Sequence, residues 1–175
     1  MPGVDVEHAI VIHQLMARFA TGIDTCDWAM YRSVFADEID LDYSSWRASS
    51  VGRWRADDWV ARGTRLFPGL SATRHALTNV LITPDGEGAA RVRANVCADH
   101  VVVDATGTAV FTLNGFYDDR CVLTGDGWRI TGKRLVMQWT TGDRALLDAA
   151  AARVAAGSPL RITSEWSVAQ GGDGS

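Results

Sequence analysis

Three stretches in the first 70 residues repeat apolar positions every three or four residues, the spacing of an amphipathic helix. The first runs from Val6 to Ile23 and has Asp5 as its N-cap. Asp27 caps a second, shorter helix that packs back on the first as a helical hairpin. A third helix begins at Ala56 and is stopped by the Pro-Gly pair at positions 68 and 69. Their apolar positions are Ile12, Leu15, Met16, Phe19, Ile23, Tyr31, Val34, Phe35, Ala56, Trp59, Val60, Leu66 and Phe67.

After residue 70 the apolar period changes to two, which predicts β-strands. A short strand, Ile39–Tyr43, and a loop, Ser44–Arg55, come earlier, between the second and third helices. The connectors of the later strands are short and rich in Gly and Asp, so these strands pair as antiparallel hairpins. The four long strands are expected over Thr73–Thr83, Ala89–Val103, Ala109–Thr124 and Trp128–Trp139.

The order of these elements predicts an α+β fold, with one curved, mainly antiparallel sheet and helices gathered at the N-terminal end. Strands of this length can wrap around a cavity. Residues 1–145 are assigned to one domain, and residues 146–175 to a C-terminal helix followed by a flexible tail. The helix is expected over Arg144–Ala156 because this segment is rich in alanine, and the tail because the last residues are rich in glycine.

Composition excludes several classes of protein. The 175 residues are 47% hydrophobic and 22% charged, with 17 Lys and Arg against 21 Asp and Glu, a net charge of −4. No strong positive field is available to bind phosphates, so nucleic acid is not expected as a partner. No apolar run approaches the roughly 20 residues that span a bilayer, and the N-terminus lacks a secretory signal, so a cytoplasmic location without a membrane partner is expected. Cys26, Cys97 and Cys121 lack metal-site spacing and are expected as reduced thiols.

Three polar side chains share strand faces with apolar neighbours, because residues two apart point the same way. His75 alternates with Leu77, His100 with the alanines and valines of its strand, and Asn114 with Thr112 and Phe116. Burying such groups without partners costs about 1 to 3 kcal/mol, so they satisfy each other or face a cavity with ligand or water. A hydrogen-bonded core role is the alternative for both histidines.

Several motifs resemble the SnoaL-like family of the nuclear transport factor 2-like superfamily, over about residues 5 to 145. This resemblance implies a cone-shaped α+β barrel, wrapped around the N-terminal helices, with one deep pocket. The same fold hosts dehydratases, isomerases, cyclases, epoxide hydrolases, dehydrochlorinases and non-catalytic binders. The motifs that carry the resemblance lie at residues 23–28, 35–37, 41–44, 73–79, 98–100, 114–119 and 126–130.

The pattern of site residues is most similar to that of scytalone dehydratase, whose helix Asp, strand Tyr, two strand histidines and Asn have counterparts here. The tyrosine that precedes the helix Asp in that enzyme is Ile23 in this chain. The site of hexachlorocyclohexane dehydrochlorinases is also similar, because its helix Asp and strand His match Asp24 and His75. The position of its lysine is occupied here by Phe19, and that of its arginine by Lys133 or Arg134. The five matched positions, expected as catalytic residues, are Asp24, Tyr43, His75, His100 and Asn114.

The resemblance implies a cofactor-independent lyase or isomerase of the dehydratase type, with no bound metal, acting on a small hydrophobic hydroxy-carbonyl, polyketide-like or steroid-like compound. His75, oriented by Asp24, would remove a proton beside a carbonyl group, and Tyr43 with Asn114 would bind the carbonyl oxygen. His100 would protonate a departing hydroxyl or would itself pair with Asp24.

Two alternatives stay open. One is an epoxide hydrolase-type enzyme, which needs an Asp-Arg-Asp set that the sequence does not place. The other is a non-catalytic module for hydrophobic-ligand binding or assembly. In each case a homo-oligomer, dimer or trimer, is expected, because curved sheets of this superfamily commonly pair back to back.

Overall fold

The computed structural model describes residues 5–105 and 107–160. Its helices are α1 (Val6–Thr25), α2 (Trp28–Ser33), α3 (Ala56–Thr64), the short 3-10 helix η1 (Phe67–Gly69) and α4 (Ala145–Ala155). The two predicted N-caps are confirmed, since the Asp5 carboxylate accepts from the amide of His8 and the Asp27 carboxylate from that of Met30. Helix α1 ends at Cys26, which adopts a left-handed conformation with φ of 54°.

Six strands form one curved sheet in the order β2-β1-β6-β5-β4-β3. The strands pair antiparallel except β1 and β6, which are parallel. The predicted α+β fold with a curved sheet is confirmed, but β2 and β3 remain as two edges, so the expected barrel is not closed. The strand bounds are β1 (Phe35–Asp42), β2 (Val51–Arg55), β3 (Ala72–Pro84), β4 (Ala89–Asp104), β5 (Gly107–Thr124) and β6 (Gly127–Thr141).

Two local predictions differ from the structure between α2 and α3. The second helix, whose expected apolar positions include Phe35, ends at Ser33, and Phe35 is already the first residue of β1. The expected loop over Ser44–Arg55 contains β2, which pairs with β1 and turns at Gly52 with φ of 119°. Four of the five β2 residues are exposed, so no alternation of buried and exposed positions marked this strand in the sequence.

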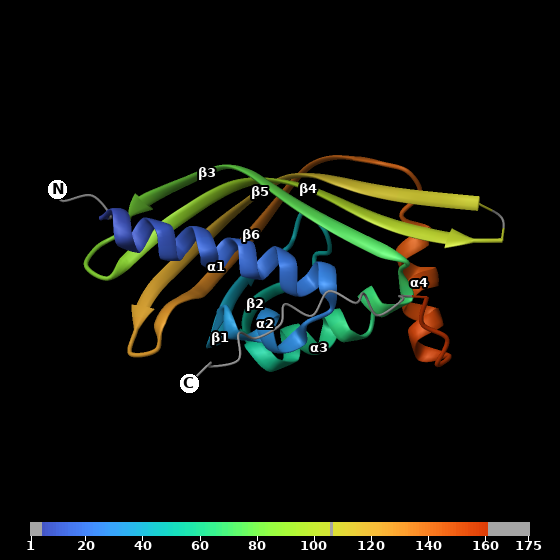
Figure 1. Cartoon of the computed structure of the whole chain (residues 1–175), viewed down its shortest axis with the longest axis horizontal. Helices are drawn as coiled ribbons and strands as arrows, with labels where there is room; N and C mark the ends of the chain where they lie inside the picture. Colours follow the sequence, from blue (N-terminus) through green and yellow to red (C-terminus); the bar gives the residue numbers. More distant parts are fainter. Residues whose placement is uncertain (1–4, 106, 161–175) are drawn as a thin grey trace, which may run out of the picture.

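Helices α1, α2 and α3 lie against the same face of the sheet (Figure 1). The core between them is apolar and includes Phe19, Phe35, Val92 and Ile130, each at most 2% exposed. Helix α4 packs against η1 at the far end, where Leu147 and Ala150 are buried. The predicted C-terminal helix is therefore present, whereas the predicted tail runs over residues 157–175, of which residues 161–175 lie outside the described residues. Within the described ranges, no helix is both long and apolar enough to cross a bilayer.

Candidate active site

Asp24, in the last turn of α1, binds His75 on β3 at two points. Its Oδ1 atom lies 2.7 Å from the ring Nδ1 of His75, and its Oδ2 accepts from the backbone amide of His75, also at 2.7 Å. The amide is available because β3 is an edge strand with one row of unpaired backbone groups. The structure thus pairs Asp24 with His75, which settles the choice between the two histidines that the sequence left open.

The pairing fixes the proton positions on the His75 ring. A carboxylate only accepts hydrogen bonds, so Nδ1 of His75 carries the hydrogen and Nε2 of the neutral ring has a free lone pair. His75 is 8% exposed as a residue, whereas the Asp24 side chain is 21% exposed. This arrangement is that of a general base whose ring is oriented by an anion.

His100 lies on the neighbouring strand β4 with its ring centroid 5.9 Å from that of His75. Its Nδ1 is 3.2 Å from the carbonyl oxygen of Phe111, so Nδ1 carries the hydrogen and Nε2 can only accept. Burial, and the neighbouring His75, lower the pKa of His100 to about 4. The ring is therefore neutral at physiological pH, which argues against the expected role of His100 in protonating a departing hydroxyl.

An aromatic side chain holds the two imidazoles in place. Phe67 of η1 stacks on His100 with centroids 6.2 Å apart and meets His75 edge-on at 6.0 Å. From its spacing, Phe67 was expected only on the apolar side of the third helix. It is instead the first residue of η1, which brings its ring against His75 of β3 and His100 of β4.

Solvent reaches the Asp24–His75 pair through a groove of about 300 Å³ between α1 and β3. Its walls are mostly apolar or small side chains of both elements, with Asp24 and His75 together among them. Polar and apolar surface contribute nearly equally to the groove, so it fits a small ligand that has both a hydrophobic part and polar groups. The remaining lining residues are His13, Met16, Ala17, Ala20, Thr21, Leu77 and Val80.

Tyr43 is placed away from the histidines, in a group of aromatic residues on the same side of the sheet. Its ring centroid is 4.8 Å from that of Trp59 and 6.5 Å from that of Tyr117. Burial is the main cause that raises the pKa of Tyr43 well above its usual value, so its hydroxyl keeps the proton and stays a hydrogen-bond donor.

Asn114 is not brought to Asp24, His75 and His100. In the register of the sheet, His75 is opposite Ala98 and Ala98 is opposite Leu113, so these side chains share one face. Asn114 is opposite Cys97 and Trp139 and therefore points to the other face. The apolar neighbours that suggested a buried face are on the outer side of β5, whereas Phe111, Leu113 and Tyr117 line the core.

A buried ion pair that the sequence did not reveal lies close to Tyr43 and Tyr117. Lys133 Nζ is 2.7 Å from Asp119 Oδ2, and both side chains are 0% exposed. Burial raises the pKa of Asp119 to about 6 and lowers that of Lys133. The sequence left open whether Lys133 or Arg134 faces inward; Lys133 does, while Arg134 pairs with Asp42 at the surface.

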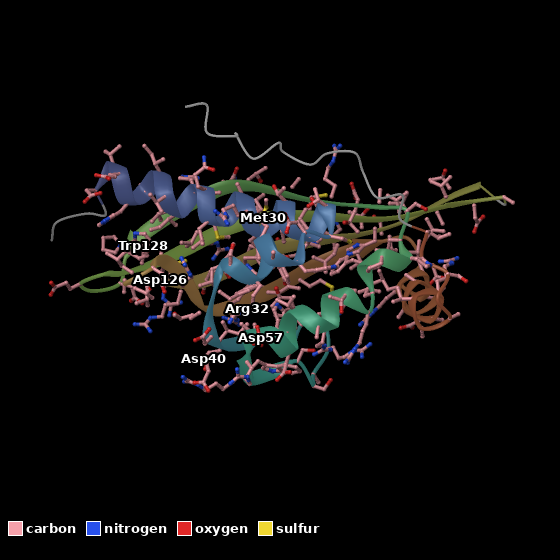
Figure 2. All side chains as sticks on the ribbon, turned by 60° about the horizontal axis from the view of Figure 1, so that its bottom comes forward. Met30, Arg32, Asp40, Asp57, Asp126 and Trp128 are labelled. Atoms are coloured by element: carbon pink, nitrogen blue, oxygen red, sulfur yellow. The ribbon has the colours of Figure 1, made fainter. Side chains whose placement is uncertain are left out.

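The alternative epoxide hydrolase-type site needs an Asp-Arg-Asp set, and the described part of the chain has two, those of Arg91 and Arg32. Arg91 lies between Asp85 at 4.0 Å and Asp118 at 3.2 Å, outside the groove at the Asp24–His75 pair. Arg32 of α2 bridges Asp57 of α3 at 2.5 Å and Asp37 of β1 at 2.7 Å. Figure 2 shows Arg32 and Asp57 side by side. The two carboxylates are 61% and 89% exposed, and both are used by the arginine. This set joins surface elements and does not line the groove that contains the Asp24–His75 pair.

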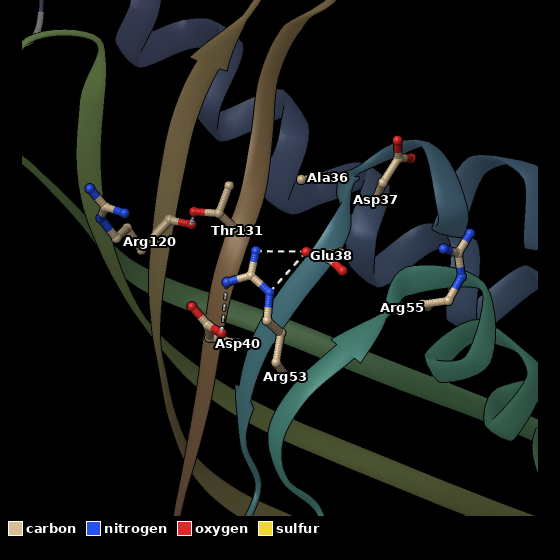
Figure 3. A pocket seen from close by; sticks show the side chains of 8 residues that line it. All are labelled: Ala36, Asp37, Glu38, Asp40, Arg53, Arg55, Arg120 and Thr131. Carbon is tan, nitrogen blue, oxygen red and sulfur yellow. Dashed lines mark hydrogen bonds and ion pairs between the residues drawn. The ribbon is translucent and has the colours of Figure 1, made fainter.

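A second hollow, of about 580 Å³, lies on β1 and β2 and contains only charged, small or hydroxyl side chains (Figure 3). Its arginines are already paired with carboxylates, as shown by Arg53 with Glu38 at 2.7 Å and Arg120 with Asp85 at 3.2 Å. We therefore place the candidate active site at the Asp24–His75 pair and not here.

A family model described as a SnoaL-like domain matches residues 6–134. No curated protein matches the chain. Among solved structures, a protein from Kribbella flavida is 28% identical, with a TM-score of 0.72 over 85% of this chain and 99% of its own.

Two solved structures with named activities share the fold at lower identity. A candidate scytalone dehydratase from Novosphingobium aromaticivorans is 19% identical, with a TM-score of 0.64 over 80% of this chain and 93% of its own. A hexachlorocyclohexane dehydrochlorinase is 15% identical, with a TM-score of 0.61 over 75% of this chain and 86% of its own. Since the family match spans most of the sequence and the fold agrees, this chain belongs to the SnoaL-like domain family.

Proposed function

We propose that this protein is a cofactor-independent lyase or isomerase of the dehydratase type, acting on a small hydrophobic hydroxy-carbonyl compound. The observation that carries the proposal is the double hydrogen bond from Asp24 to His75, which leaves His75 Nε2 as a free base. The apolar side chains in the groove at this pair, among them Met16, Leu77 and Val80, support a ligand with a hydrophobic part. Dehydratase and dehydrochlorinase activities are named among proteins of the same fold.

The reaction can be written with every atom accounted for. His75 Nε2 removes the proton from the carbon beside the carbonyl group, and Asp24 stabilises the imidazolium that forms. The electron pair of that C–H bond moves onto the carbonyl oxygen as an enolate, for which Tyr43 provides a donor. When the enolate collapses, the β-carbon to oxygen bond breaks, and the leaving hydroxide takes the proton from His75. One water is lost, and His75 returns to its neutral form.

His100 has a different part in this scheme from the one expected from the sequence. Its Nδ1 donates to Phe111, so its Nε2 accepts a hydrogen bond from a hydroxyl group of the substrate. A neutral acceptor beside the base orients the substrate without competing for the proton of the imidazolium.

The test follows exchange of the substrate's α-protons with deuterated water by NMR, together with loss of water, for β-hydroxy ketones, polyketide-like phenols and steroid enones. The wild type is compared with His75→Ala and with His8→Ala, a matched control at a partly exposed histidine of α1 that does not line the groove. Exchange and dehydration that vanish only in His75→Ala support the base. Ligands that raise the melting temperature of all three proteins without any exchange favour the non-catalytic binding module.

A further inference from the structure

We propose that the substrate is an extended, chain-shaped hydroxy-carbonyl compound with a carboxylate at its far end, and that His13 is the specificity-determining residue that binds this carboxylate. The chain lies in the groove between α1 and β3, with its reacting end at the Asp24–His75 pair. The inference rests on the proposed function, because that function places the reacting carbon at His75. It narrows the substrate to one shape and one charge.

The first argument is the row of residues that α1 contributes to the groove. Four lining residues follow one another at spacings of four, three and four, which places them along one side of the helix. The row spans roughly 16 Å at the rise of an α-helix. Its two central members are alanines, whose small side chains leave room for a ligand along the helix. The row consists of His13, Ala17, Ala20 and Asp24.

The second argument is the opposite wall, which β3 forms with apolar side chains. Strand β3 runs alongside α1 in the opposite direction, so His75 lies by the C-terminal end of the helix and later residues lie toward its N-terminal half (Figure 1). Leu77 follows His75 on this wall by the alternation of a strand. The bulge at Asn79, whose φ is 52°, then brings Val80 to the wall in place of Asn79. The stretch of β3 beyond His75 therefore offers the ligand an apolar surface.

The third argument is the shape of the space. A volume of about 300 Å³ distributed along this row leaves a mean cross-section of roughly 20 Å², close to that of one extended hydrocarbon chain. A fused tetracyclic ring system is wider than such a chain. Of the compounds expected from the sequence, the groove therefore favours a chain-shaped one over a steroid-like one.

The fourth argument is the distribution of polar groups. Thr21 lies within one turn of Asp24, whereas His13 is the polar side chain at the other end of the groove. Among residues 5–105 and 107–160, His13 has no hydrogen-bond or ion-pair partner, so its ring N–H is free to donate to a ligand. The carboxylate of Asp24 repels an anion nearby. A ligand that carries a carboxylate is therefore most stable with that group at His13 and its neutral end at His75.

The test measures binding by isothermal titration calorimetry with three probes, the chains below their micelle concentrations. The probes are ω-hydroxydodecanoic acid, dodecanol, which lacks the carboxylate, and progesterone, a tetracyclic ketone. We expect the wild type to bind the acid about tenfold more tightly than dodecanol, and not to bind progesterone. His13→Ala should remove the preference for the acid and leave the affinity for dodecanol within about threefold.

Two pairs of variants test the walls of the groove. Ala17→Leu fills the groove from an exposed position of α1 and should lower the affinity for both chains about tenfold or more. The matched control Gln14→Leu adds the same side chain at an exposed position of α1 outside the groove, and both affinities should stay within about threefold. On β3, Val80→Ser should weaken both chains, whereas Leu81→Ser, at a side chain that is 59% exposed and outside the groove, should not.

The outcomes separate this inference from the proposed function. An unchanged preference for the acid in His13→Ala, equal affinities in Ala17→Leu and Gln14→Leu, binding of progesterone as tight as that of the acid, or no binding of the acid by the wild type each overturn the inference. Normal α-proton exchange in His75→Ala overturns the proposed function, while the calorimetry still decides whether the groove binds a chain. Exchange that is lost in His75→Ala, together with no binding of either chain, keeps the base and rejects the chain-shaped substrate.

Discussion

Asp24 and His75 come from elements 51 positions apart in the chain, and the carboxylate binds both the backbone amide and the ring of the histidine at 2.7 Å. One contact anchors the edge strand to the end of α1, and the other selects the tautomer of the ring. A single side chain therefore has a structural role and a chemical role, and the two can be separated by measurement.

Asp24→Asn is the variant that separates them. The asparagine side chain has one uncharged accepting oxygen in place of two charged ones. It therefore cannot bind the backbone amide and the ring Nδ1 of His75 with a separate oxygen each, as Asp24 does. We expect kcat to fall by about 10²-fold or more, because the wrong tautomer becomes populated. The free energy of unfolding should fall by only about 1 to 3 kcal/mol.

The control for this variant is Asp27→Asn, because asparagine caps a helix about as well as aspartate. Its kcat and unfolding free energy should match those of the wild type. A kcat for Asp24→Asn within threefold of the wild type would show that the carboxylate only ties α1 to β3.

The period-two pattern predicted the four long strands to within a few residues, because most inward positions of β4, β5 and β6 are apolar. What the pattern lacked was the β-bulges. An extra residue near Asn79, with φ of 52°, and another at Thr131 each reverse the alternation along their strand. The second reversal turns Lys133 into the core in place of Arg134.

The candidate site was predictable in part for the same reason. The alternation of strand residues between the two faces placed His75 and His100 correctly on the apolar face, because no register shift lies between them in the pairing of β3 and β4. The prediction for Asn114 was wrong because β5 has apolar side chains on both faces, so the alternation alone does not say which face belongs to the core. The contact between Asp24 and His75 depends on how α1 crosses the sheet edge, which no local pattern encodes.

His100 predicts how stability changes with pH. The pKa of this group is about 4 in the folded protein against 6.5 ordinarily, so the unfolded chain binds more protons between these values. The contribution of His100 to stability is complete above pH 6.5 and is lost as the pH falls toward 4. At 1.36 kcal/mol per pKa unit, the loss is about 3 kcal/mol.

Urea denaturation at pH 7.0 and pH 4.5 measures this loss. Carboxylates also titrate in this interval, so the relevant quantity is the difference between the wild type and His100→Gln, which has no ionisable group at this position. The stability of the wild type should fall more steeply with acid than that of the variant. Equal pH slopes would mean that His100 accepts a proton without penalty in the fold.

The buried ion pair predicts that removing one partner lowers the free energy of unfolding far more than replacing both. Lys133→Ala leaves the Asp119 carboxylate buried without its cation, which should cost about 3 to 5 kcal/mol of unfolding free energy. Replacing both partners, as Lys133→Met with Asp119→Leu, should recover most of that loss because no charge remains buried. Arg134→Ala removes an exposed pair with Asp42 and should cost under about 1 kcal/mol. A double variant as unstable as Lys133→Ala would indicate a packing effect instead of an electrostatic one.

Gly69 predicts how firmly α4 is bound to the rest of the fold. A Cβ atom at this position would lie 2.0 Å from the carbonyl oxygen of Ala150 and 2.6 Å from its carbonyl carbon, so backbone would have to move. Because α4 contributes Leu147 and Ala150 to the core through this contact, Gly69→Ala should cost about 2 kcal/mol or more and expose the amides of α4 to hydrogen exchange. Gly125→Ala is the matched control, since nothing lies within 4 Å of its added methyl group. If Gly69→Ala leaves amide protection in α4 unchanged, the two segments can separate by the width of a methyl group without loss, and α4 is not held by this close approach.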